Sequence, residues 1–203
     1  MFARLRPWYE KVTLGFGRAS VRLGLTPNAW TLFSALAALL AGVLFGAQQL
    51  LGGLLLAAVM NIADMLDGAT ARAGGLASRF GSVLDHVLDR YAEFFLFAGL
   101  MIGGYFSPAS AVFCASGVIM ASYVRAKAES VGGLKSCVVG WAGRQEKLTI
   151  LYVGIVIALL GEPAALDVAA WVIGLISHWT SLQRLLYTRQ QIELQAAQKP
   201  SSD

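Results

Sequence analysis

Residues 61–97, NIADMLDGATARAGGLASRFGSVLDHVLDRYAEFFLF, place four aspartates in a stretch that otherwise has the composition of membrane-embedded helices. They are Asp64, Asp67, Asp85 and Asp89, four of the six aspartates in the 203 residues. Ionisable side chains are costly inside a bilayer and mark functional sites by default. A structural ion-pair network or a proton path is the plainer alternative. Both the fold and the chemistry depend on how these carboxylates meet.

The composition predicts an all-α integral membrane protein. The chain is 57% hydrophobic and 14% charged, whereas a soluble domain carries about 25% charged residues. A helix needs about 20 apolar residues to cross a bilayer core of about 30 Å. We expect six transmembrane helices, at roughly 29–49, 50–70, 80–103, 107–127, 147–161 and 164–186. The segment 147–161 is the shortest of them.

The basic residues predict the orientation of the chain. Fifteen of the 16 Lys and Arg residues lie before the first span, in or beside the connections between the second and third and between the fourth and fifth spans, or at the end of the sixth span and after it, and the sixteenth, Arg90, lies inside the third. The three remaining connections contain none. Positive charge gathers on the cytoplasmic side of membrane proteins. We therefore expect a multi-pass protein of the cell membrane with both termini, and an active site, facing the cytoplasm.

One domain is expected over residues 1–203, without internal repeats. Residues 1–27 mix basic and aromatic residues and predict an amphipathic interfacial helix, with a soluble cap as the alternative. Residues 28–187 would form the six-helix bundle and 188–203 a frayed polar tail. The net charge of +4 is spread along one membrane face without a nucleic-acid motif. Membrane lipids and phosphorylated substrates are therefore the expected partners, and nucleic acid is not.

Helical spacing predicts that the four aspartates meet at one depth. Asp64 and Asp67 are three residues apart and Asp85 and Asp89 are four apart, so each pair shares a helix face. Gly74 and Gly75 mark a turn between the pairs. In an antiparallel hairpin, positions equally far from the turn lie at the same level. Counted from a turn near residues 76–77, Asp67 and Asp85 form one such pair, and Asp64 and Asp89 form another.

Four ionised carboxylates in a small volume repel one another and need compensation by protonation, by cationic side chains or by bound cations. Arg72 and Arg90 are too few to neutralise four acids. Mg²⁺ prefers oxygen ligands and combines a few carboxylates with substrate phosphates. Two such ions would form a centre of the kind that supports displacement at phosphorus. Mn²⁺ accepts the same ligands.

The pattern Asp64-x2-Asp67-Gly68-x2-Ala71-Arg72-x8-Gly81-x3-Asp85-x3-Asp89 resembles the signature of the CDP-alcohol phosphatidyltransferases at all eight positions. The resemblance implies a membrane enzyme that transfers a phosphatidyl-type group from a CDP-linked lipid to an alcohol and releases CMP. It also implies a six-helix homodimer with a polar cavity open to the cytoplasm.

The resemblance further implies a role for each matching residue. Asp64, Asp67, Asp85 and Asp89 would bind two Mg²⁺ or Mn²⁺ ions, and Asp89 would also act as the general base on the acceptor hydroxyl. The segment LTPNAWTLFS resembles the family's entry to the first span. The residues expected to contact the CDP-lipid are Pro27, Asn28, Thr31, Gly68, Ala71, Arg72 and Gly81.

Segments 122–133, 140–151 and 79–90 resemble the branch that uses inositol 1-phosphate as the acceptor, with CDP-diacylglycerol or its ether-lipid counterpart CDP-archaeol as the donor. The side chains expected to bind the acceptor phosphate are Arg125, Arg144 and Arg184, with Lys127 added by proximity. Glu129 and Glu146 would orient the neighbouring arginines, and His86 would face away from the aspartates. Basic residues at helix ends are also routine membrane anchors. Glycerol 3-phosphate is the alternative acceptor and would need a similar pocket.

Two more distant alternatives are an aspartate-rich membrane prenyltransferase and a divalent-cation carrier. The first needs a second aspartate-rich motif far along the chain, and no aspartate cluster follows Asp89. The second would not require Gly68, Arg72 and Gly81 at their offsets from the acids.

Overall fold

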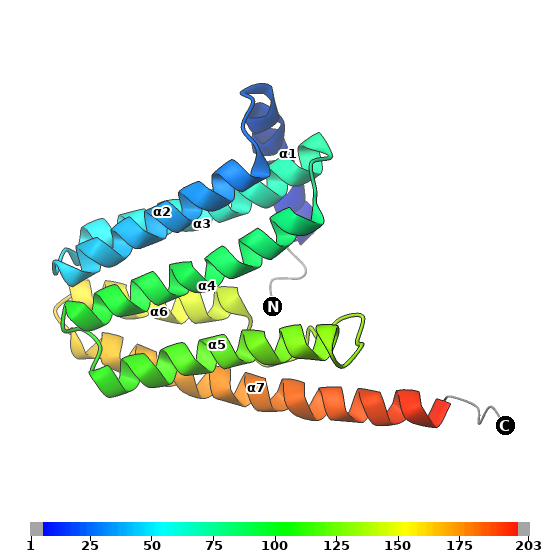
Figure 1. Cartoon of the computed structure of the whole chain (residues 1–203). Coiled ribbons are helices and arrows are strands. Elements are labelled where there is room, and N and C mark those ends of the chain that lie inside the picture. Colours follow the sequence, from blue (N-terminus) through cyan, green and yellow to red (C-terminus); the bar gives the residue numbers. More distant parts are fainter. Residues whose placement is uncertain (1–5, 199–203) are drawn as a thin grey trace. The chain divides into compact units, whose positions relative to one another are not determined.

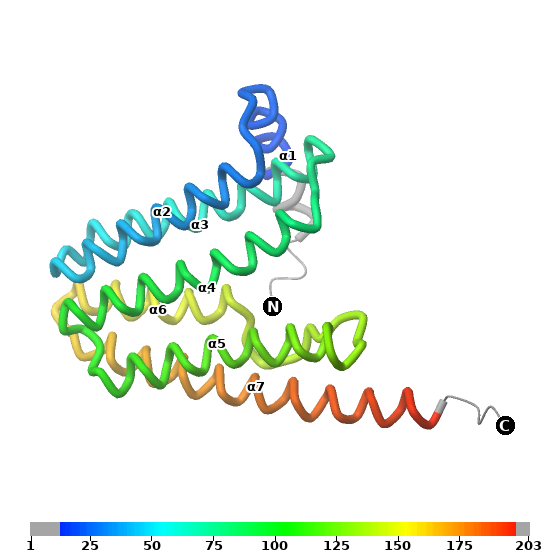
Figure 2. Tube along the Cα trace, viewed as in Figure 1, coloured from blue at the N-terminus to red at the C-terminus, as the bar shows by residue number. Residues whose placement is uncertain are grey.

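The structure, a computed structural model, describes residues 6–198, and side chains from Thr13 to Ala197. Within these residues the chain forms seven α-helices and no strand, which confirms the all-α prediction (Figures 1 and 2). The first residues of the expected interfacial helix and the last residues of the expected tail, 1–5 and 199–203, lie outside the described part. The chain divides into two compact units that meet in sequence at Gly103 and Gly104.

The first unit is built around its second helix. It contains α1 (Arg6–Arg22), α2 (Pro27–Gly46), α3 (Leu50–Gly74) and α4 (Arg79–Ile102). The helix α2 packs against both α3 and α4, and α1 packs against α3. The helices α3 and α4, although consecutive in sequence, share few contacts along their described lengths. The aspartates of α3 and α4 are therefore placed by the way both helices pack on α2.

Local capping fixes where α3 ends and α4 begins. Gly75 has a φ of 62°, in the left-handed region that glycine adopts without strain, and its N–H bonds back to the carbonyl of Ala71. Ser78 caps α4, with its hydroxyl accepting a hydrogen bond of 2.9 Å from the N–H of Gly81. The turn predicted from the glycine pair is thus confirmed.

Small residues bring α2 and α4 close together. A Cβ added to Gly99 would overlap the backbone of Gly42, and one added to Gly42 would overlap the carbonyl of Phe95. Close approach through small residues is the usual means of packing helices in a membrane. The contact seats α4 along α2 and so sets the position of the acids on α4.

The second unit contains α5 (Pro108–Ser130), α6 (Arg144–Leu159) and α7 (Ala164–Gln198), with α7 packed against both others. Asp167 at the start of α7 accepts hydrogen bonds from the backbone N–H of Ser107, at 2.7 Å, and from the hydroxyl of Ser110. These bonds tie the beginnings of α5 and α7 together.

Among the described residues, four helices are long and apolar enough to cross a bilayer: α2, α3, α5 and residues Ala164–Ala197 of α7. On α2, Leu32, Leu36 and Val43 form an exposed apolar stripe, as expected of a surface that faces lipid. The other two expected spans differ from these four. The 24-residue α4 carries several charges, and the 16-residue α6 covers only about 24 Å at 1.5 Å per residue.

The last helix also continues beyond the expected end of the sixth span at residue 186, as far as Gln198. Its final turns are rich in helix-forming residues. Arg189 and Glu193, one turn apart, form an ion pair with an N–O distance of 2.8 Å. The described part of residues 188–203 is therefore helical, where we expected a frayed tail.

Candidate active site

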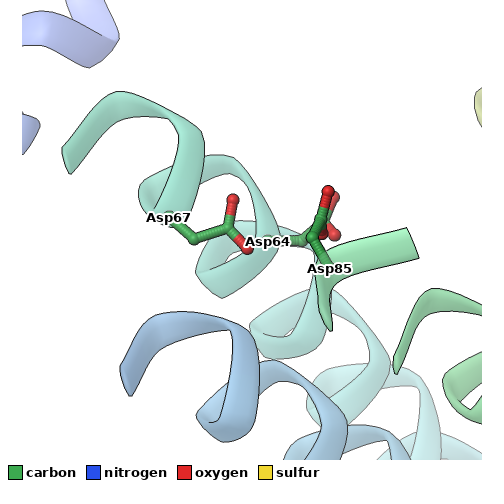
Figure 3. A group of neighbouring side chains, drawn as sticks. All are labelled: Asp64, Asp67 and Asp85. Carbon is green, nitrogen blue, oxygen red and sulfur yellow. The ribbon is translucent and has the colours of Figure 1, made fainter. Parts of the chain in front are cut away.

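Three of the four aspartates form a carboxylate cluster. Asp64 and Asp67 extend from α3 and Asp85 extends from α4, and one oxygen of each lies within 4.8 Å of the others. Figure 3 shows the three carboxylates gathered between the two helices. The predicted convergence is confirmed for these three residues. Three carboxylates this close form an oxygen-rich site of the kind that hard divalent cations prefer.

A hydroxyl group from α2 holds one member of this cluster. Thr31 donates a hydrogen bond of 2.9 Å to the Oδ2 atom of Asp67, and both residues are buried. Because the bond joins α2 to α3, it orients the Asp67 side chain toward α2. The helix α2 also packs against α4, which carries Asp85. Thr31 is thus tied to the acidic cluster as well as bordering the cavity described below.

Asp89 is not a member of this group of three, and its convergence with the other carboxylates stays a prediction. It sits one turn beyond Asp85 on α4, about 6 Å further along the axis. The Oδ2 atom of Asp89 lies 3.9 Å from Nη2 of Arg90, and Nη1 of Arg90 is 2.6 Å from Oε2 of the buried Glu93.

Sequence reasoning missed Glu93, although a signal was present. It is an acidic residue in an apolar helix, four residues after an aspartate of the signature. Acids in such positions are rare without a partner. The ion pair with Arg90 supplies one.

The cluster opens into a cavity of about 270 Å³. Asp67 and Asp85 lie in its wall, and all seven residues expected to contact a CDP-lipid line it as well: Pro27, Asn28, Thr31, Gly68, Ala71, Arg72 and Gly81. Leu76, Ala77 and Ser78 of the turn between α3 and α4, and Ser82 in the first turn of α4, complete the lining, and none of the four was expected from the sequence. Residues next to the signature can be assigned to the cavity lining only when the structure shows which way the turn runs.

Two glycines keep this cavity open. A Cβ on Gly68 would lie 3.1 Å from Nη1 of Arg72, and a Cβ on Gly81 would lie 2.9 Å from Oγ of Ser78 and 3.1 Å from Oδ1 of Asn28. Each contact is tighter than side chains normally tolerate. The glycines therefore allow an arginine, a serine and an asparagine to approach the helix backbone along the cavity wall.

His86 does not face away from the aspartates as expected. Its Nδ1 atom lies 3.4 Å from Oδ2 of Asp85, while its side chain is 66% exposed. Adjacent helix positions point about 100° apart, but a long side chain can fold back across that angle.

The basic residues expected to bind the acceptor phosphate all belong to the second unit. Nε of Arg125 donates to Oε1 of Glu129 at 3.0 Å, as we expected of Glu129. Arg144 is the first residue of α6. Nζ of Lys127 lies 5.6 Å from the ring centre of Tyr123.

Arg184 and Glu146 make backbone contacts. Arg184 donates to the carbonyl oxygens of Val139, at 2.8 Å, and Ala121, at 2.6 Å. Glu146, which we expected to orient an arginine, accepts a hydrogen bond of 3.0 Å from the N–H of Gly143 and closes the start of α6.

Residues 24–183 match the family model of the CDP-alcohol phosphatidyltransferases. This match spans most of the chain and includes the carboxylate cluster, the cavity and three of the four basic residues expected to bind the acceptor phosphate, the exception being Arg184. The chain therefore belongs to the CDP-alcohol phosphatidyltransferase family and is a membrane enzyme of that class.

Two named members of the family are similar to this chain over most of its length. The archaetidylinositol phosphate synthase of Methanothermobacter thermautotrophicus is 33% identical over 172 residues, which cover 85% of this chain and 87% of the relative. The phosphatidylinositol phosphate synthase of Mycolicibacterium smegmatis is 36% identical over 195 residues, which cover 91% and 87% of the two chains.

Two crystal structures of the Mycobacterium tuberculosis phosphatidylinositol phosphate synthase share the fold, each with a TM-score of 0.79 and 31% identity. One has CDP-DAG bound, and the match covers 88% of this chain and 94% of that one. The other is a complex with manganese and citrate, with coverage of 87% and 88%.

Proposed function

We propose that this enzyme transfers a phosphatidyl or archaetidyl group from a CDP-linked lipid to a hydroxyl of inositol 1-phosphate and releases CMP. The observation that carries the proposal is a cavity whose wall contains two members of the carboxylate cluster and all seven residues expected to contact the donor. One relative is named for an archaetidylinositol phosphate product and another for a phosphatidylinositol phosphate product. Both names support inositol 1-phosphate as the acceptor.

The cavity suits the head group of the donor. Pockets for drug-sized ligands measure about 300–1,000 Å³, so a cavity of about 270 Å³ holds a nucleotide head group but not two lipid chains. The chains would lie against the apolar outer surface of the helices. Arg72 in the cavity wall offers a planar guanidinium to the diphosphate.

The residues present fit a divalent metal. Asp64, Asp67 and Asp85 provide carboxylate oxygens within 4.8 Å of one another, which is the donor chemistry that Mg²⁺ and Mn²⁺ share. We propose two ions, with Asp89 as an additional ligand. When bound, they would neutralise charge on the diphosphate and stabilise the leaving CMP.

Asp89 would act as the general base. Its carboxylate takes the proton from the acceptor hydroxyl, and the oxygen forms a bond to the lipid-bearing phosphorus. The bond between that phosphorus and the CMP oxygen breaks, and CMP leaves with the electron pair. The place of Asp89 one turn beyond Asp85, outside the carboxylate cluster, suits a group that serves the acceptor.

Arg125, Arg144 and Arg184, with Lys127 as an auxiliary, would bind the phosphate of the acceptor. A phosphomonoester needs several charge-assisted hydrogen bonds, and arginine is suited to supply them. A guanidinium has five N–H donors, so the carbonyl contacts of Arg184 are compatible with a phosphate contact. Glycerol 3-phosphate remains the alternative acceptor because it presents the same phosphate group.

We also propose that α4 and α6 are the two remaining spans. Val83, Val87 and Phe94 give α4 an exposed apolar stripe, so its charged residues need not face lipid. With six spans, both termini and the cavity would face the cytoplasm, and α1 would lie at the interface. We propose a homodimer, and we propose that residues 1–203 act as one domain, because the family match runs through both compact units.

The test is CMP release by the full chain purified in detergent with Mg²⁺ and either ester- or ether-linked CDP-lipid. Inositol 1-phosphate, glycerol 3-phosphate and free inositol are offered separately, and Asp89→Asn is the control. We expect release with inositol 1-phosphate that falls at least 100-fold in the control, in line with the roughly 10²–10⁴-fold contribution of a general base. Release with glycerol 3-phosphate alone would retain the mechanism and overturn the acceptor.

A further inference from the structure

The segment that leads into α6 is held by side chains acting on its backbone. We call residues 137–143 the strap. Three of its alternate residues are bound in this way: the Cys137 N–H donates to Glu129 Oε1 at 3.0 Å, the Val139 carbonyl accepts from Arg184 Nε at 2.8 Å, and the Trp141 N–H donates to Gln183 Oε1 at 3.1 Å. The partners come from α5 and α7, so the strap is bound to both helices.

These bonds, rather than burial of its own side chains, hold the middle of the strap. Val138 is 73% exposed and Trp141 is 80% exposed. Apolar burial is found near the two ends of the strap, where Cys137 joins a small buried cluster with Ala128 and Leu134 and Ala142 is 9% exposed. A segment whose side chains face outward keeps its path only as long as its backbone groups have partners.

The strap connects residues expected to bind the acceptor phosphate. At one end, the Oε1 atom of Glu129 accepts from Cys137 N–H and also from Nε of Arg125, both at 3.0 Å. At the other end, Gly143 begins α6 and is followed directly by Arg144. A shift of the strap would therefore change the positions of Arg125 and Arg144 relative to each other.

We infer that Gln183 and Glu129 are positioning residues that set acceptor affinity by holding the strap. Neither needs to touch the acceptor. Gln183 acts through the backbone of Trp141, and Glu129 acts through Arg125 and the backbone of Cys137. The inference rests on the proposed function of the basic residues in this unit. Binding of the CDP-lipid, which we assign to the first unit, does not depend on the strap.

The first test removes the hydrogen-bond acceptor at Gln183. Gln183→Met keeps the length of the side chain and loses the oxygen, whereas Gln183→Glu keeps an acceptor oxygen at the same reach. Gln190→Met, at an exposed position on the same helix, is the matched control. KM for inositol 1-phosphate, KM for CDP-lipid and kcat are measured on detergent-purified full-length protein.

Loss of one hydrogen bond predicts a rise in the acceptor KM of about five- to tenfold in Gln183→Met. The donor KM and kcat should stay within about twofold, and Gln183→Glu and Gln190→Met should resemble the wild type. An unchanged acceptor KM, an equal rise in both KM values, or a Gln183→Glu variant as impaired as Gln183→Met would overturn the inference. If Gln183→Met does not purify as folded protein, Gln183→Asn allows the same comparison. Its side chain is shorter by one methylene group, so its amide oxygen no longer reaches the N–H of Trp141.

Glu129 gives a second, independent test with its own control. Glu129→Ala removes the partner of both Arg125 and Cys137, so its effect on the acceptor KM should exceed that of Gln183→Met. Glu193→Ala breaks the same kind of ion pair, with Arg189 one turn away on α7, and should leave both KM values unchanged. Equal effects of the two glutamate variants would count against a role for the strap.

The two proposals fail in different ways. If the wild type turns over glycerol 3-phosphate and not inositol 1-phosphate, the proposed acceptor is wrong, and the strap is tested by the same KM comparison with glycerol 3-phosphate. If free inositol is used and no phosphorylated acceptor is, both proposals are overturned.

Discussion

At the scale of single residues, the bond from Thr31 to Asp67 gives the most direct test of the carboxylate cluster. Thr31→Val keeps the shape of the side chain and loses the hydroxyl that donates to Asp67 Oδ2. Partners that orient metal ligands typically contribute about 10–100-fold to metal affinity. We expect the Mg²⁺ concentration for half-maximal CMP release to rise by about that factor, with activity recovering at high Mg²⁺.

The matched control at this position is Thr31→Ser, which retains the hydroxyl and should keep the Mg²⁺ dependence close to that of the wild type. Chelation by EDTA should abolish CMP release by both variants and by the wild type, and added Mg²⁺ should restore it. Identical Mg²⁺ titrations for the valine and serine variants would show that the bond does not position Asp67 for metal.

At the scale of elements, the start of α4 links helix capping to the shape of the cavity. Gly81→Ala would place a methyl group 2.9 Å from Oγ of Ser78, which caps the helix, and 3.1 Å from Oδ1 of Asn28, which also lines the cavity. Because both neighbours must shift, we expect the KM for CDP-lipid to rise at least about tenfold. We expect little change in the KM for the acceptor.

Gly15→Ala is a suitable control for the same chemical change. Gly15 lies within a helix, and an added Cβ would meet nothing within 4 Å. That substitution should leave both KM values unchanged and stabilise α1 slightly, since alanine favours a helix by about 1 kcal/mol over glycine. If the KM for CDP-lipid were the same in Gly81→Ala and Gly15→Ala, Gly81 would have no role in shaping the site for the donor.

These elements also show what the sequence could predict. Spacings of three and four residues place side chains on one helix face whatever the tertiary structure, so Asp64, Asp67 and Gly68 could be assigned together from the sequence. The capped turn after Gly75 brought Asp85 to the same site. The distance from Asp89 to this cluster could not be predicted from the sequence, because it depends on how α3 and α4 each pack on α2.

The strap was beyond sequence reasoning for a related cause. Its path depends on bonds between backbone groups and side chains up to 45 residues away in the chain, such as that from Arg184 to Val139. Gln183 carries no motif that would single it out, because a glutamine on a helix is an ordinary surface residue. Arg125, by contrast, could be paired with Glu129 in advance because the two are one helical turn apart.

At the scale of the whole molecule, the number of spans decides which loops face the cytoplasm. In the part of the chain that the structure describes, four helices are long and apolar enough to cross a bilayer, whereas α4 falls short by its charge and α6 by its length. If only those four cross and the N-terminus is cytoplasmic, the loop between α5 and α6 lies outside the cell. If all six cross, that loop is cytoplasmic. The loop between α6 and α7 lies outside in both cases.

Cysteine labelling in intact cells separates the two arrangements. Lys135 and Glu162 are exposed and lie in the two loops in question, and the native Cys114 and Cys137 are buried and react poorly. We expect Glu162→Cys to react with a membrane-impermeant maleimide in intact cells and Lys135→Cys to react only after permeabilisation. Positive charge in the loop that carries Lys135 favours this outcome. Labelling of Lys135→Cys in intact cells would place the strap outside, away from cytoplasmic inositol phosphate, and six spans would then be wrong.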